Sequence, residues 1–93
     1  MSAVFRKKGQ QAIEVSQSWE LETAIADVSR WLRESSKAMS VRGWVLDIGF
    51  NSRLDSVAVQ GETVSVAFMR QLVDHDIDLW LSLYPPVESQ ILE

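Results

Sequence analysis

The fold is decided by one stretch near the end of the chain, Asp76-Ile77-Asp78-Leu79-Trp80-Leu81-Ser82-Leu83-Tyr84. From Ile77 to Leu83, every second residue is aliphatic. Successive side chains of a β-strand point to opposite faces of the sheet, so this alternation predicts a half-buried strand with an aliphatic core face. Pro85 and the proline after it end the strand, because proline has no N–H to donate to a neighbouring strand. We therefore expect the rest of the chain to cover this aliphatic face.

Two amphipathic segments predict the covering helices. One runs from about Thr23, which is a suitable N-cap, to Met39. In the other, Ser65 is a suitable N-cap, and Val64 before it is spaced to pack against Met69. The residues expected on the buried stripes are Ile25, Val28, Leu32 and Met39 in the first helix, and Phe68, Met69, Leu72 and Val73 in the second.

Further strands are expected on both sides of the first helix. Trp44 to Asn51 alternates clearly, with Trp44, Leu46, Ile48 and Phe50 on its apolar face, and Trp31 and Trp44 are expected in the core. Weaker signals lie at residues 11–15, 19–22 and 56–60. The order strand, helix, strand, short strand, helix, strand predicts an α+β fold. We expect a two-layer sandwich of the ferredoxin-like type, with a mainly antiparallel sheet and two helices on one face. We expect one domain over residues 1–93, with residues 1–10 and 87–93 peripheral or frayed.

Composition excludes several classes of protein. The chain has 93 residues, 46% of them hydrophobic and 24% charged, which is typical of a globular domain. A net charge of −4 argues against a nucleic-acid partner. The absence of cysteine excludes disulfides and thiolate metal sites. No apolar run is long enough to span a membrane or resembles a signal peptide, so we expect no membrane partner and a cytoplasmic location.

A resemblance to a known family rests on three parts of the sequence. They are the turn Lys7-Lys8-Gly9 with Ser18-Trp19-Glu20-Leu21, the amphipathic helix, and the ending Val64-Ser65, Leu72 and Asp76 to Tyr84. This order, over Lys7 to Tyr84, resembles the bacterial family called domain of unknown function 4279. Members carry a further strand and helix before the glycine turn, and this chain is expected to begin after them. The family has no established activity, so the resemblance implies no functional residue.

No stretch of the chain carries a strong catalytic pattern. Asp74-His75-Asp76 is the only cluster that resembles a metal or acid–base site, but zinc needs further nitrogen or sulfur ligands and His75 is the sole histidine. A polar helix end is the simpler interpretation. The basic run Arg6-Lys7-Lys8 is interpreted as a solvated turn. We expect no metal, no cofactor and no enzymatic activity.

The final strand carries the candidate interaction surface. Its alternation places Trp80 and Tyr84 opposite the aliphatic face, where large aromatic side chains form a partner surface or are covered by a local segment. Asp47 and Asp78 are expected on the same face, either as a coupled carboxylate pair or as two solvated aspartates. The surface is therefore predicted to comprise Trp80, Tyr84, Asp78 and Asp47.

These observations favour a non-enzymatic protein-interaction module, of which an immunity-type protein is one form. The alternative is a small-ligand sensing domain with a pocket between sheet and helices. We also expect a homodimer, because a chain without the opening elements of its family has a sheet edge free for pairing. In the competing arrangement, residues 1–15 fold back and cover that edge.

Overall fold

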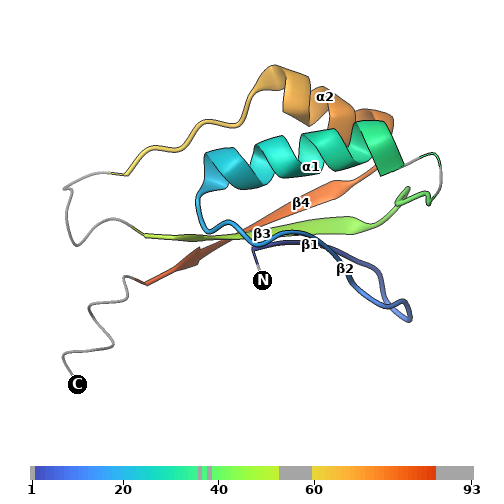
Figure 1. The fold of residues 1–93 in the computed structure, drawn as a ribbon, viewed down its shortest axis with the longest axis horizontal. Helices are drawn as coiled ribbons and strands as arrows, with labels where there is room; N and C mark the ends of the chain where they lie inside the picture. The colour runs from blue at the N-terminus through green and yellow to red at the C-terminus, as the bar shows by residue number, and fades with distance from the viewer. Residues whose placement is uncertain (1, 36, 38, 53–59, 86–93) are drawn as a thin grey trace.

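The computed structural model describes residues 2–35, 37, 39–52 and 60–85. Its elements are β1 (Ala3–Arg6), β2 (Ile13–Ser16), α1 (Leu21–Ser35), β3 (Val45–Asn51), α2 (Val66–Asp74) and β4 (Asp78–Tyr84). The four strands form one sheet in the order β2-β1-β3-β4. Figure 1 shows both helices on the same side of this sheet. The predicted α+β class is confirmed.

The sheet is mixed. β1 runs antiparallel to both β2 and β3, whereas β3 and β4 are parallel because α2 carries the chain back between them. In the ferredoxin-like order a helix separates the first two strands. The hairpin of β1 and β2 departs from that order. The short strand predicted at residues 56–60 falls almost wholly on residues outside the described part of the chain.

The first ten residues were expected at the periphery, and for β1 that prediction is wrong. β1 lies between β2 and β3, and Ala3, Val4 and Phe5 are at most 2% exposed. Because the three buried residues are consecutive, this short strand shows no apolar–polar alternation and therefore carries no period-two signal. Residues 87–93 lie outside the described part of the chain.

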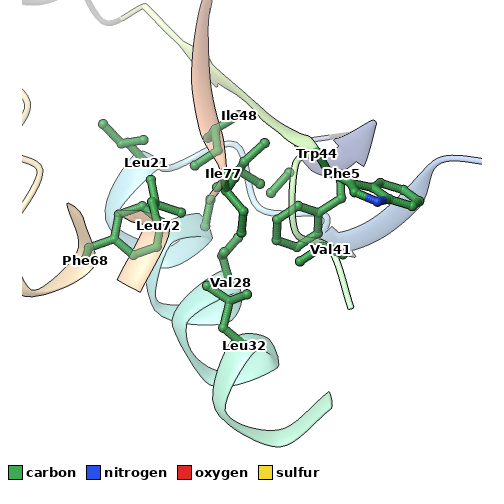
Figure 2. Packing of buried hydrophobic residues seen from close by; sticks show 13 residues of the cluster. Phe5, Leu21, Val28, Leu32, Val41, Trp44, Ile48, Phe68, Leu72 and Ile77 are labelled. Atoms are coloured by element: carbon green, nitrogen blue, oxygen red, sulfur yellow. The ribbon is translucent and has the colours of Figure 1, made fainter. Parts of the chain in front are cut away.

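The core lies between the helices and the sheet. Figure 2 shows Val28 of α1, Leu72 of α2 and Ile77, just before β4, converging at its centre. As predicted, Trp44 is buried, and the ring centroid of Trp31 lies 5.1 Å from that of Phe5. Both predicted helical stripes are only partly buried. The buried members are Val28, Leu32, Phe68 and Leu72, whereas Met39, Met69 and Val73 are exposed.

The two ends of α2 are closed by local hydrogen bonds. Ser65 is the N-cap, as predicted, and its Oγ accepts a hydrogen bond from the Phe68 N–H at 3.1 Å. At the other end, the Asp76 N–H donates to Val73 O and the Ile77 N–H donates to Leu72 O, at 3.0 and 2.9 Å. This is the Schellman arrangement, with Asp76 in the left-handed position (φ 56°) that glycine usually occupies.

The aliphatic face of β4 is covered only at its beginning. Ile77 is buried and Leu79 is half-buried, but Leu81 and Leu83 are 45% and 57% exposed. The nine residues of α2 span about 14 Å at 1.5 Å per residue. The seven residues of β4 span about 23 Å at 3.3 Å per residue. Because the helix is shorter than the strand, the expectation that all four aliphatic residues are buried is wrong.

Candidate functional site

The four residues of the predicted interaction surface lie on two neighbouring strands. The parallel register places Asp47 beside Trp80 and Asn51 beside Tyr84, on the face of the sheet opposite the helices. We call this face the open face. Asp78 lies beside Val45 rather than beside Asp47. The coupled carboxylate pair is therefore not formed, and Asp47 has other partners.

Those partners form a chain of polar contacts across three strands. Trp80 Nε1 donates to Ser82 Oγ at 2.9 Å, and Ser82 Oγ donates to Asp47 Oδ1 at 3.4 Å. The other carboxylate oxygen of Asp47 pairs with Arg6 Nε of β1 at 3.2 Å. The indole of Trp80 is thus held in place, although 64% of the residue is exposed.

Tyr84 is partly covered by another aromatic side chain, whereas Trp80 is not. Its ring contacts Trp19, from the segment before α1, with ring centroids 5.1 Å apart. Of the two interpretations of these aromatic residues, local covering applies in part to Tyr84, while Trp80 stays open. Sequence reasoning did not place Trp19 here. The available signal was Gly49, a glycine inside a strand, which often marks a close approach of another group.

The outer edge of β4 is the most exposed part of the sheet. Within the part of the chain that the structure describes, no strand pairs with this edge. The hairpin of β1 and β2 lies on the other side of β3, so the described residues 2–15 do not fold back over the outer edge of β4. Exposed apolar side chains occur on both faces of β4 and on α2 nearby: Trp80, Leu81, Leu83, Tyr84, Met69, Val73 and Val66.

The Asp74-His75-Asp76 segment is the C-terminal cap of α2. The His75 N–H donates to Gln71 O, and Asp74 O accepts a hydrogen bond from Arg42 Nη2 at 2.9 Å. No group of three residues able to hold a metal ion occurs among the described residues. Nor does any described helix have the length and apolar character needed to cross a membrane.

One surface cavity lies on the open face, and another lies at the edge of the sheet–helix core, where Leu21 and Phe50 line it. One, of about 750 Å³, is on the open face beside Arg6, Asp47 and Trp80. The other, of about 570 Å³, lies between Trp19 and Phe50 and is bordered by three glutamates. The interface between sheet and helices, where a ligand pocket was predicted as the alternative, is packed with core side chains (Figure 2).

Fold and surface thus define a small α+β domain with one exposed, apolar outer strand. No protein-family model, curated protein or solved structure matches the chain. The resemblance to the domain of unknown function 4279 stays a prediction.

Proposed function

We propose that this chain is a two-layer α+β protein-interaction module without enzymatic activity, and that its partner is a second copy of itself, joined along β4. One observation carries the proposal. β4 is an outer strand of seven residues with large apolar side chains exposed on both faces, among them Trp80 at 64% and Leu83 at 57%. An exposed edge of this kind offers unpaired N–H and C=O groups to another strand.

The backbone direction of β4 shows which of its groups are available. Within a strand, the N–H and C=O of one residue point the same way, and that direction alternates along the chain. The Asp78 N–H donates to Trp44 O, and Tyr84 O accepts from the Ser52 N–H, so the even-numbered residues face β3. The backbone groups of Leu79, Leu81 and Leu83 therefore point outward.

An antiparallel pairing centred on Leu81 uses all of these outward groups. Leu81 then faces Leu81 of the partner subunit, and Leu79 faces Leu83 of the partner subunit, each pair exchanging two hydrogen bonds. If the register shifts by two residues in one direction, Leu79 faces Pro85 of the partner subunit, which has no N–H. If the register shifts by two residues in the other direction, Leu83 faces Ile77 of the partner subunit. The Ile77 N–H already donates to Leu72 O within its own chain, at 2.9 Å. Of these registers, only the one centred on Leu81 pairs every outward N–H and C=O of Leu79, Leu81 and Leu83.

The side chains agree with this register. On the helix side each leucine of β4 meets a leucine of the second copy, which covers the half-exposed Leu81 and Leu83. On the open face Trp80 lies opposite Ser82, and Asp78 lies opposite Tyr84. Asp78 is the only charged residue of β4, so no like charges face each other.

The exposed stripe of α2 extends the same surface. The Gln71 side chain is hydrogen-bonded to Ser29 of α1, so the flank of α2 that carries Gln71 faces α1. At about 100° per residue, Met69, Val73 and Val66 lie on the opposite flank. Because α2 packs on α1 and β4, that flank lies toward the outer edge of β4. Pairing two β4 strands brings two such stripes toward each other and removes apolar surface from water.

Molar mass in solution tests the proposal directly. We expect a dimer in size-exclusion chromatography with light scattering at micromolar concentration, and a monomer for Leu81→Lys. The matched control is Met39→Lys, since Met39 is 46% exposed and Leu81 45%, but Met39 lies after α1. Circular dichroism checks that both variants are folded. A monomeric parent chain, or equal behaviour of the two variants, contradicts the proposal.

The register is tested by single cysteines, because the chain has none of its own. Facing residues of a hydrogen-bonded antiparallel pair lie about 5.5 Å apart at Cα, within the range that a disulfide bridges. Under mild oxidation Leu81→Cys should cross-link to itself. Leu79→Cys and Leu83→Cys should cross-link efficiently only when the two proteins are mixed. Efficient cross-linking of Leu83→Cys alone would show a different register.

A further inference from the structure

We infer that the open-face cavity is a binding site for a small aromatic anion. The cavity has a volume of about 750 Å³, within the range of ordinary ligand pockets. It lies on the face of the sheet away from the helices, where β1 ends and β3 begins. The residues that line it are Arg6, Lys7, Lys8, Gln10, Ala12, Gly43, Val45, Asp47 and Trp80.

The charge of this cavity is opposite to that of the chain. The chain has a net charge of −4, yet three cations and a single carboxylate line the cavity. Asp47 is already engaged by Arg6 and Ser82. Lys7 and Lys8 form no ion pair within the described residues. Two uncompensated ammonium groups beside one cavity attract an anion.

Arg6 is oriented to contribute to the same anion site. It pairs with Asp47 through Nε, and its two Nη groups have no hydrogen bond within the described part of the chain. The side chain is 49% exposed, so these donors are open to a ligand. A guanidinium held by a carboxylate on one side is suited to a planar or tetrahedral anion on the other.

The aromatic part of the ligand is indicated by Trp80. Its indole N–H is fixed by Ser82, which in turn is fixed by Asp47, so the ring and the guanidinium of Arg6 are held by one polar chain. Val45 and Ala12 add apolar surface to the cavity. A flat ring packs against Trp80 and Val45, while its carboxylate or phosphate contacts Arg6, Lys7 and Lys8.

The turn that carries Lys7 and Lys8 is closed by a backbone hydrogen bond and by a left-handed glycine. Gln10 N–H donates to Lys7 O at 3.0 Å, and Gly9 adopts the left-handed conformation (φ 81°) that closes this turn. The two lysines are therefore held at the border of the cavity by the hairpin of β1 and β2. The basic run, interpreted from sequence as a solvated turn, acquires a specific role from its position.

The test is a titration of the full chain followed by nuclear magnetic resonance, in which the indole N–H of Trp80 gives its own signal. The probes are AMP and 4-hydroxybenzoate, which carry both a ring and an anion, with adenosine and inorganic phosphate as single-part controls. We expect at least one of the two aromatic anions to bind saturably, shifting the Trp80 indole and the amides of Lys8 and Val45. Preference for AMP would identify a phosphate ligand, and preference for 4-hydroxybenzoate a carboxylate.

Two charge reversals give the matched comparison. Lys8→Glu lies in the exposed turn, and the loss of one charge-assisted contact should weaken binding about tenfold. Arg70→Glu makes the same charge change on an exposed position of α2 and should leave binding unchanged. The inference is overturned if neither aromatic anion binds, if phosphate or adenosine alone binds as tightly, or if the two variants behave alike.

Discussion

The indole of Trp19 meets the phenol ring of Tyr84 edge to face, with ring planes at 87°. Gly49 of β3 lies beneath both rings. A Cβ at position 49 would be 2.6 Å from Cε2 of Tyr84 and 3.3 Å from Cζ3 of Trp19. The absence of a side chain at Gly49 therefore lets the end of β4 contact the segment that precedes α1.

Gly49→Ala is expected to reduce the free energy of unfolding by about 1–2 kcal/mol, from steric overlap with Tyr84 and a weakened aromatic pair. Removing a glycine from a strand favours folding by about 0.5–1 kcal/mol, which is too little to compensate. Urea denaturation of the monomer measures the difference. In a Tyr84→Ala background the overlap is gone, so the same substitution should become neutral or stabilising. An equal loss in both backgrounds would contradict this account of Gly49.

Two leucines of the helix-facing side should differ in their contribution to monomer stability. Leu46 of β3 is fully buried, and Leu46→Ala should cost about 2–5 kcal/mol. The alternation of β4 alone predicts a similar loss for Leu81→Ala. Because Leu81 is 45% exposed, we expect a loss below about 1 kcal/mol instead. Denaturation at concentrations low enough to give monomer makes the comparison, and equal losses would mean that Leu81 is covered within one chain.

Asp76→Gly is expected to stabilise the protein by about 0.5–1 kcal/mol. A non-glycine residue in the left-handed region carries a steric cost of about 1–2 kcal/mol, part of which is offset by the greater flexibility of glycine when unfolded. Asp76→Ala removes the same carboxylate but retains a Cβ, and it should not stabilise. The two variants are compared by thermal unfolding. A gain for alanine as large as that for glycine would point to the charge of Asp76 rather than to its backbone.

Ser65→Ala should destabilise the protein by about 1 kcal/mol, because the Phe68 N–H loses its acceptor at the start of α2. Ser65→Asp keeps an acceptor and should remain close to the parent chain. Chemical denaturation gives both values. If aspartate is as damaging as alanine, the hydroxyl contributes in some way other than capping.

Sequence alone determined those features that depend on neighbours along the chain. The alternation in Trp44 to Asn51 placed β3, and the alternation in Asp76 to Tyr84 placed β4. Ser65 marked the start of α2 because capping involves residues only three positions apart. The open face of Trp80 and Tyr84 followed from the same period-two geometry.

Tertiary structure decided everything that depends on which segments meet. The first three residues of β1 are buried one after another, so alternation could not reveal this strand. Its last residue, Arg6, is exposed and lies 41 residues from its partner Asp47. The alternation in β4 also indicates which of its faces is apolar, but it does not indicate whether a helix is long enough to cover that face. Strand order made β4 an outer strand and left Leu81 and Leu83 exposed. The exposed edge and the cationic cavity both arise from these long-range pairings, for which residues close in sequence carry no signal.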